Sequence, residues 1–244
     1  MRDKNKVNNL VLQKIWDDSY LQYPLNVAKK TDPVRIWLEE KIPRDKKTCF
    51  EIGCFPGRYL AVFGIHGYEL NGIDSTPRIN NDLLYWLKTQ KFKIGKFYNQ
   101  DFLKFRETIK FDVVCSFGFI EHFVEWKEII RKHTYLVNNE GYLIISTPNF
   151  RGFVQKHLHK LLDNENYNRH NLCSMNPGEW KIILEKEGFE VIYYGYFGGF
   201  KFWTNNSKKK IFEKIISKIL TILFKNLPNS EYYSSFCGIV AKKI

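Results

Sequence analysis

Residues 48–57 read Thr48-Cys-Phe-Glu-Ile-Gly-Cys-Phe-Pro-Gly57, a short apolar segment that runs into a loop with glycines at positions 53 and 57. A helical pattern follows this loop. A strand-to-helix turn of this kind lets a ligand approach the backbone and places it at the positive N-terminus of the helix. The segment therefore predicts a ligand-binding loop. Because such turns also occur in sheets that bind nothing there, the prediction depends on a second feature elsewhere in the chain.

Asp74 is this second feature. It ends the apolar run 68–74 and follows Gly53 by 21 residues (74 − 53). An acid at the end of the second strand, about 20 residues beyond the loop, can accept hydrogen bonds from both hydroxyls of an adenosine ribose. The alternative interpretation is a solvated turn residue before Ser75. Taken together, the loop and Asp74 predict a cofactor that contains adenosine.

Dinucleotides and S-adenosylmethionine both contain adenosine. The dinucleotide fingerprint G-x-G-x-x-G brings a pyrophosphate against bare backbone, but position 55 is Phe and the third glycine is missing from the sequence. A Tyr-x-x-x-Lys pair is missing as well, since Tyr85 is followed by Thr89 at the lysine position. These departures argue against a short-chain dehydrogenase or a nucleotide-sugar epimerase.

Short apolar runs alternate with amphipathic stretches along most of the chain. The runs that we expect to form strands are 48–53, 68–74, 97–101, 111–117, 142–147, 189–196 and 235–241. Helical patterns occupy 57–66, 79–90, 121–137, 176–187 and 208–225, and residues 10–41 are mostly helical with a break at Pro24. Strands that alternate with helices imply right-handed crossovers and a largely parallel sheet, so the chain is predicted to have an α/β fold.

The segment Glu51-Ile-Gly-Cys-Phe-Pro-Gly57 resembles motif I of the class I S-adenosylmethionine-dependent methyltransferases, in the branch whose loop reads G-C-x-P-G. The resemblance continues in order from residue 48 to 196, through Asp74, Asp101-Phe102, a motif IV-like segment 111–122 that ends in Glu-His, and Gly141–Asn149. It departs at Phe55, which replaces the middle glycine. The resemblance implies a Rossmann-like sheet of seven strands, mostly parallel with a reversed last strand, with helices on both faces.

The resemblance also implies S-adenosyl-L-methionine as the cofactor and a set of residues that bind it. Glu51 is expected near the amino group of the methionine part, Asp74 at the ribose, and Asp101 with Phe102 at the adenine. The complete expected set is Glu51, Gly53, Cys54, Gly57, Asp74, Ser75, Asp101, Phe102 and Ser116. Because the positive sulfur already activates the methyl group, the enzyme mainly has to align an acceptor and exclude water.

Histidines are the first candidates for a catalytic base, since an oxygen acceptor needs one near neutral pH. His122 is expected to start the helix after the fourth strand, where the alternative role is a structural hydrogen bond. His170 precedes a helix opened by Asn176-Pro-Gly and is the preferred base. His157 and His159 lie on a basic stretch and are expected to face solvent. The spacing of ligand-type residues predicts no metal site.

Composition favours a single domain in a reducing, cytoplasmic compartment. The five cysteines form no C-x-x-C pair, and the N-terminus is too polar for a secretory signal. We expect a helical cap over 1–45, a cofactor-binding core over 46–198, and a basic amphipathic helix with the last strand over 199–244.

The basic segment accounts for half of the net charge of +12, because seven lysines and one glutamate between residues 200 and 226 contribute 7 − 1 = +6. One interpretation of Lys208–Lys225 is peripheral contact with an anionic membrane face, and the preferred one is a helix packed on the domain by its apolar side. The stretch Ser116-Phe-Gly-Phe stands where amino-group methyltransferases of nucleic acids carry Asn/Asp-Pro-Pro-Tyr/Phe, so no nucleic-acid partner is expected.

The predicted reaction is methyl transfer to an oxygen, in preference to a nitrogen, of a small molecule such as a sugar or a secondary metabolite. Two alternatives stay open. One is a lipid-linked or isoprenoid acceptor at the membrane surface. The other is a non-catalytic protein of the same fold that binds the cofactor, or nothing, and acts as a partner subunit.

Overall fold

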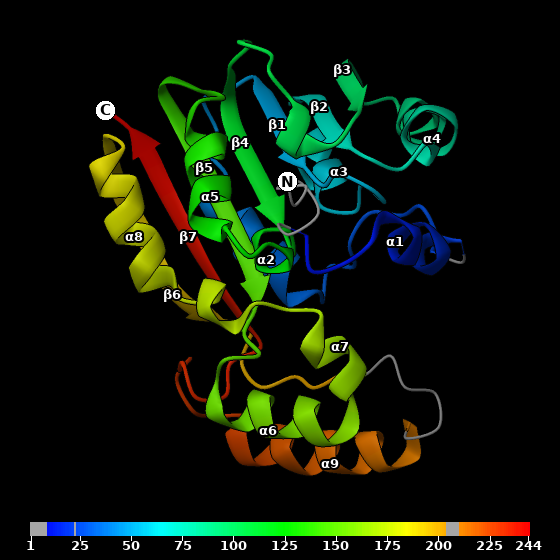
Figure 1. Cartoon of the computed structure of the whole chain (residues 1–244), viewed down its shortest axis with the longest axis vertical. Coiled ribbons are helices and arrows are strands. Elements are labelled where there is room, and N and C mark those ends of the chain that lie inside the picture. Colours follow the sequence, from blue (N-terminus) through cyan, green and yellow to red (C-terminus); the bar gives the residue numbers. More distant parts are fainter. Residues whose placement is uncertain (1–8, 22, 204–209) are drawn as a thin grey trace, which may run out of the picture.

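The computed structural model describes residues 9–21, 23–203 and 210–244, in which seven strands form one sheet (Figure 1). The order across the sheet is β3-β2-β1-β4-β5-β7-β6. Their bounds are β1 Thr48–Ile52, β2 Glu69–Asp74, β3 Lys93–Asn99, β4 Phe111–Phe117, β5 Val137–Pro148, β6 Phe189–Phe197 and β7 Phe236–Lys243. Only β7 runs antiparallel to its neighbours β5 and β6. The predicted fold, with its reversed last strand, is confirmed.

Helices lie between most of the strands. Their bounds are α1 Gln13–Tyr20, α2 Pro33–Lys41, α3 Leu60–Ile65, α4 Leu84–Thr89, α5 Trp126–Thr134, α6 Phe153–Leu162, α7 Asn164–Asn168, α8 Pro177–Lys186 and α9 Lys210–Phe224. The helix predicted for 79–90 begins as a π-helix over Ile79–Leu83 before α4. Lys208 and Lys209, part of the predicted basic helix, lie outside the described residues.

Alternate residues of the central strands face two separate hydrophobic layers, as the period of two in a strand requires. Phe50, Val114 and Leu143 pack in the layer that holds α5 and α8. Cys49, Val113 and Ile144 point the other way, into the layer that holds α2, α3 and α4. Because both faces are covered, the central strands are almost continuously apolar.

The N-terminal segment divides between these layers and the edge of the sheet. Asp32 caps α2 by accepting hydrogen bonds from the backbone N–H groups of Val34 and Arg35, and the helix packs its Trp37 and Leu38 on the sheet. Helix α1 buries no residue and lies beside the carboxyl ends of the strands (Figure 1). Of the two helices in the segment 1–45, α1 lies at the edge of the sheet and α2 belongs to the layer on the sheet.

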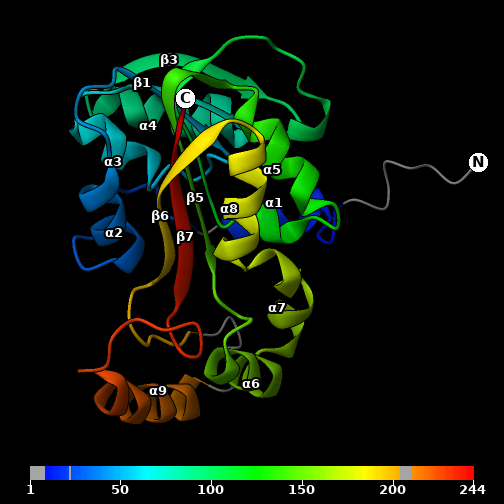
Figure 2. The same cartoon turned by 90° about the vertical axis from the view of Figure 1, so that its left-hand side faces the viewer.

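Helices α6, α7 and α9 form a further group beyond the carboxyl ends of the parallel strands (Figures 1 and 2). Helix α9 packs on this group through Ile216, Leu220 and Phe224. The outer side of α9 is apolar too, with Ile211, Ile215, Ile219, Ile222 and Leu223 each more than half exposed. The preferred prediction of a packed apolar face therefore describes only part of the helix.

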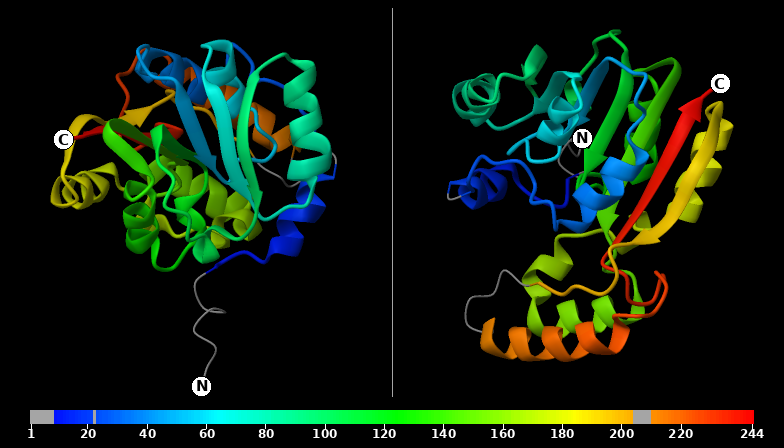
Figure 3. Two further views of the ribbon diagram at one scale, coloured as in Figure 1. Left: turned by 90° about the horizontal axis from the view of Figure 1, so that it is seen from above. Right: turned by 180° about the vertical axis from the view of Figure 1, so that it is seen from behind.

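Among the residues that the structure describes, no helix has both the length and the apolar character needed to cross a membrane. The view from above in Figure 3 places the twisted sheet between its helical layers.

Candidate functional site

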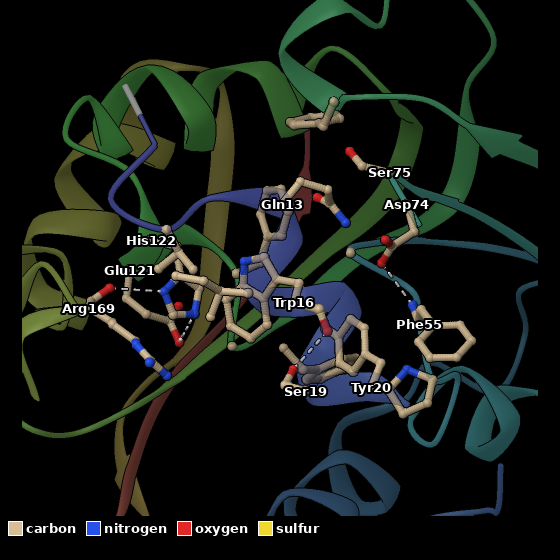
Figure 4. Close-up of a pocket in the computed structure, with 18 of the residues that line it drawn as sticks. Gln13, Trp16, Ser19, Tyr20, Phe55, Asp74, Ser75, Glu121, His122 and Arg169 are labelled. Carbon is tan, nitrogen blue, oxygen red and sulfur yellow. Dashed lines mark hydrogen bonds and ion pairs between the residues drawn. The ribbon is translucent and has the colours of Figure 1, made fainter. Parts of the chain in front are cut away.

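A cavity of about 420 Å³ opens at the carboxyl ends of β1, β2 and β4 (Figure 4). Its wall includes Glu51 and Gly53 from the end of β1, Asp74 from the end of β2 and Phe117 from the end of β4. The volume suits a ligand of the size of a nucleoside cofactor. Open parallel sheets bind ligands at this edge, between strands whose crossovers go to opposite faces.

The loop after β1 needs glycine at two positions. Gly53 and Gly57 have φ angles of +71° and +82°, which L-residues with side chains rarely adopt. A Cβ atom at Gly53 would also lie 2.6 Å from Cδ2 of Phe119, and one at Gly57 would collide with Leu83. The two glycines therefore keep the loop backbone close to the cavity that both of them line.

The carboxylate of Asp74 is held by the backbone on both sides. The N–H of Phe55 donates to Oδ2 and the N–H of Thr76 donates to Oδ1, each at 3.0 Å. Burial raises the pKa of Asp74 to about 6 in spite of these hydrogen bonds. Each carboxylate oxygen can accept more than one hydrogen bond, so the two oxygens of Asp74 can still accept hydrogen bonds from two ligand hydroxyls.

Glu51 lies on β1 with its side chain almost fully buried. Its Oε2 atom has no hydrogen-bond partner among the described residues, and burial raises its pKa well above the usual range. A buried carboxylate oxygen without a donor is unfavourable unless a ligand supplies one. An ammonium group, directly or through water, fits this position.

Asp101 and Phe102 line the cavity as well, together with Ser75. Asp101 accepts a hydrogen bond from the N–H of Leu103 at 2.9 Å and thereby starts the short 3₁₀ turn Phe102–Lys104. Phe102 is buried within the layer of α5, with its ring centroid 5.9 Å from that of Phe119. An acid and an aromatic ring at one wall suit a flat nitrogen-containing ring.

Two residues of the predicted cofactor set are not in the cavity wall. The Cys54 side chain packs across β2, where a Cβ at Gly72 would lie 2.7 Å from its sulfur. Ser116 Oγ lies 3.1 Å from Nε2 of buried His133. The structure thus brings together seven members of that set: Glu51, Gly53, Gly57, Asp74, Ser75, Asp101 and Phe102.

Helix α1 contributes side chains that the cofactor motifs do not reveal. Trp16 and Tyr20, one helical turn apart, both line the cavity (Figure 4). The Tyr20 ring centroid is 5.0 Å from that of Phe55, and the Arg78 guanidinium lies 4.9 Å from the Phe55 centroid on another side. Phe55, the departure from the family loop, therefore joins the loop to α1.

The far end of the cavity holds Glu121, His122 and His170 among aromatic side chains. We call it the acceptor end, after the role predicted from the sequence for the two histidines. The ring centroids of His122 and His170 are 4.7 Å apart. Trp16 lies at the same centroid distance from His122, and Phe150 from His170. The structure therefore brings together the two histidines predicted as bases, although 48 residues separate them (170 − 122).

In both histidines Nε2 makes no hydrogen bond to a described residue. Nδ1 of His122 lies 3.2 Å from the carbonyl oxygen of Arg169, and Nδ1 of His170 lies 2.6 Å from that of Asn166. A carbonyl only accepts, so Nδ1 carries the proton in each ring. Burial lowers the pKa of His122 to about 3 and that of His170 to about 4, which leaves both neutral at pH 7.

Glu121 is fully buried beside these rings. Neither of its carboxylate oxygens has a hydrogen-bond partner among the described side chains and backbone, and Oε1 lies 3.9 Å from Nε2 of His122 (Figure 4). Burial raises the pKa of Glu121 to about 8. Glu121 and His122 belong to a 3₁₀ turn, Ile120–His122, and α5 begins only at Trp126, so the prediction that His122 starts a helix is wrong.

The two histidines of α6 differ in their surroundings. His157 is exposed as predicted, with Nδ1 2.7 Å from the carbonyl of Phe153. His159 is fully buried, with its ring centroid 3.7 Å from that of Phe150, so the prediction that it faces solvent is wrong. The prediction rested on the lysines that neighbour His159 in the sequence. In the structure, α6 turns its His159 side toward the cavity wall.

Three further residues line the acceptor end but were not predicted as site residues from the sequence: Asn166, Arg169 and Trp203. Arg169, the C-cap of α7, pairs with Glu165 in the first turn of that helix. The run Asn166–His170 is polar and places Asn166 and His170 at i, i+4, a spacing that marks one face of a helix. That spacing could have identified the segment as a single wall of the site.

Comparison with known proteins agrees with this geometry. The sequence matches a family described as a methyltransferase domain over residues 28–194, which is more than half of the chain. No curated protein matches the sequence.

Solved structures share the fold at low sequence identity. An S-adenosylmethionine-dependent methyltransferase from Archaeoglobus fulgidus is 20% identical with a TM-score of 0.57, covering 86% of this chain and 93% of its own. Magnesium protoporphyrin IX methyltransferase from Synechocystis PCC 6803, with bound S-adenosylhomocysteine, is 15% identical with a TM-score of 0.54, covering 86% and 80%.

The N-methyltransferase NodS from Bradyrhizobium japonicum WM9, also with S-adenosylhomocysteine, is 13% identical with a TM-score of 0.52, covering 86% and 83%. The family match, the sheet order with its reversed β7, and the cavity at the ends of β1 and β2 lead to one conclusion. The chain belongs to the methyltransferase domain family and is a class I S-adenosylmethionine-dependent methyltransferase.

Proposed function

We propose that the protein transfers the methyl group of S-adenosylmethionine to a hydroxyl oxygen of a small molecule, in preference to a nitrogen. Glu51 holds the ammonium group of the cofactor, Asp74 the ribose hydroxyls, and Asp101 with Phe102 the adenine. The orphaned Oε2 of Glu51 and the backbone-fixed carboxylate of Asp74 support this placement. The acceptor end is then the part of the cavity left for the second substrate.

The pair of Nε2 atoms on His122 and His170, which make no hydrogen bond to a described residue, is the observation that carries the oxygen preference. A neutral amine attacks a methyl group through its own lone pair and loses its proton afterwards. A hydroxyl is a weak nucleophile until a base takes its proton. His170 and His122 offer neutral imidazole lone pairs at the cavity wall, because their Nδ1 protons are committed to backbone carbonyls.

The aromatic surround favours a flat or ring-shaped acceptor. Trp16, Phe150 and Trp203 line the acceptor end. Both an aromatic secondary metabolite and the C–H face of a sugar pack on such rings. We therefore expect a hydroxyl carried on a ring of about the size of a monosaccharide.

The test is methyl transfer from labelled S-adenosylmethionine to matched pairs of phenols and anilines, and of sugars and amino sugars. The proposal expects the hydroxyl member of a pair to be methylated faster. Faster methylation of the amines would overturn the oxygen preference. Binding of S-adenosylhomocysteine without transfer to any member of a broad acceptor panel would favour the non-catalytic alternative.

The exposed face of α9 favours a second candidate, an acceptor that is lipid-linked or isoprenoid and reaches the protein at a membrane surface. Ile215, Ile219 and Ile222 are between 53% and 66% exposed. Lys218 on the same helix and Lys225 just after its end are exposed cations. Apolar side chains flanked by lysines are typical of helices that lie on anionic lipid.

Co-sedimentation with phosphatidylglycerol vesicles tests this candidate, with phosphatidylcholine vesicles as the neutral surface. The triple variant Ile215→Ser/Ile219→Ser/Ile222→Ser is expected to remain in the supernatant. A matched control, Ile36→Ser/Ile182→Ser/Ile192→Ser, changes three exposed isoleucines on other elements and should sediment like the original protein. Equal sedimentation of both variants would remove the membrane candidate.

A further inference from the structure

Glu121, His122 and His170 form a cluster that the cofactor does not explain. One carboxylate oxygen of Glu121 and one nitrogen from each histidine lie within 4.8 Å of one another. Glu121 and His122 come from the turn after β4, and His170 lies two residues beyond the end of α7. The fold thus brings a carboxylate and two imidazoles to one point from distant parts of the sequence.

Among the described residues, the group nearest in charge terms to the Glu121 carboxyl is the neutral ring of His122, 3.9 Å away. Both oxygens are buried without a hydrogen-bond donor in the described part of the chain. Arg169, a cation in the same wall, is paired with Glu165. Burial favours the protonated acid, and a cation bound beside Glu121 would stabilise the ionised carboxylate and offset its desolvation.

The two histidines are oriented as metal ligands usually are. Each donates its Nδ1 proton to a backbone carbonyl, that of Arg169 or Asn166. Metal-bound histidines characteristically donate their other ring N–H in this way, which fixes the tautomer and aims the remaining lone pair. The free atom in each ring is therefore Nε2, the atom that binds a metal.

The distances also suit a metal. Ligand bonds of about 2.0–2.2 Å place tetrahedral ligands about 3.4 Å apart. Starting from separations of at most 4.8 Å, each ligand atom has to move by less than about an ångström to reach that geometry. Small side-chain rotations supply such movements.

We propose that Glu121, His122 and His170 bind one divalent transition-metal ion of the zinc type, with an open coordination position facing the cavity. Two imidazoles and one carboxylate are a known donor set for catalytic Zn²⁺. The open position then takes the acceptor oxygen. This role rests on the proposed function, whereas the binding of the ion does not. In the metal-bound form the histidines act as ligands, and coordination lowers the pKa of the acceptor hydroxyl.

The test is a titration of the tag-free, chelator-treated protein with Co²⁺ in the absence of cofactor, followed by visible absorption. Co²⁺ stands in for Zn²⁺, whose filled d shell gives no such signal. We expect one equivalent to bind and Zn²⁺ to displace it. Glu121→Gln and His170→Asn, both close in shape to the original side chains, should each weaken Co²⁺ binding by at least about tenfold.

Two matched variants outside the cluster serve as controls. His157→Asn removes an exposed histidine of α6, and Glu190→Gln removes an exposed carboxylate of β6. Both should bind Co²⁺ like the original protein. Failure to bind Co²⁺, or equal binding by all four variants, would overturn the proposed site.

Calorimetric titration of the same samples with S-adenosylhomocysteine separates the two proposals and shows that each variant is folded. Binding of Co²⁺ without binding of S-adenosylhomocysteine would contradict the proposed function and leave the metal site standing. The reverse result would contradict the metal site alone.

Discussion

The cofactor half and the acceptor half of one cavity are built in different ways. The cofactor half uses short local segments at strand ends: the loop 51–57 after β1, Asp74 after β2 and Asp101 after β3. The acceptor half combines α1, the turn after β4, and α7. The residues predicted for the cofactor therefore come from contiguous motifs, while the end that we propose for the acceptor depends on how distant elements meet.

The largest effect should come from the acceptor half. His170→Asn keeps a polar side chain of similar size but removes the Nε2 lone pair. We expect kcat to fall by about 10²–10⁴-fold with little change in the dissociation constant of S-adenosylhomocysteine. Steady-state rates and calorimetry measure the two quantities, with His157→Asn as the control. A parallel loss of cofactor binding would show that the two halves are not separable.

A substitution in the cofactor half should instead weaken cofactor binding. Asp74→Ala removes the acceptor of two ribose hydrogen bonds, each of about 1.5–3 kcal/mol for a charged group. S-adenosylhomocysteine should then bind at least about a hundredfold more weakly. Asp45→Ala, at an exposed carboxylate, is the calorimetric control. An unchanged affinity would remove Asp74 from the site.

The pH dependence of cofactor binding should also report Asp74. Burial raises its pKa to about 6, and the ribose hydroxyls donate to the ionised form. Below pH 6 the free protein must lose a proton to bind, so the dissociation constant of S-adenosylhomocysteine should rise by up to about tenfold per pH unit. Above pH 6 the contribution of Asp74 should be flat. Asp74→Asn should remove the step near pH 6, and a step that persists there in that variant would assign it to another group.

The smallest effect concerns the contact between the halves. Tyr20→Ala removes the ring that packs on Phe55, an interaction of about 1 kcal/mol. Affinity for S-adenosylhomocysteine should fall by about fivefold. Tyr85→Ala, at an exposed tyrosine of α4, is the matched control for calorimetry. No change in Tyr20→Ala would place α1 with the acceptor half only.

The same contrast explains what the sequence could predict. Glycines with positive φ, and an acid 21 residues beyond Gly53, are local requirements that residue types reveal directly, and most of the residues predicted for the cofactor line one cavity. Cys54 and Ser116 share those motifs but point into the layers beside the sheet. The order of residues alone does not tell whether a side chain at the end of a strand points into the cavity or into a layer beside the sheet.

The acceptor half needed tertiary information. The sequence named Glu121-His122 as the end of one motif and His170 as the preferred base. It did not predict that their side chains meet, because they do so only when residues 164–170 fold over the turn after β4. His159 was assigned to solvent from its lysine neighbours, and the packing of α6 overrides them. The family resemblance predicted the cofactor motifs but not these contacts between distant elements.

Helix α1 has a consequence for turnover. It buries no residue of its own, yet its Trp16 and Tyr20 stand in the wall of the cavity. A cover held by so few buried contacts opens at low free-energy cost. We therefore expect the opening rate of α1 to limit both the release of S-adenosylhomocysteine and the binding of S-adenosylmethionine.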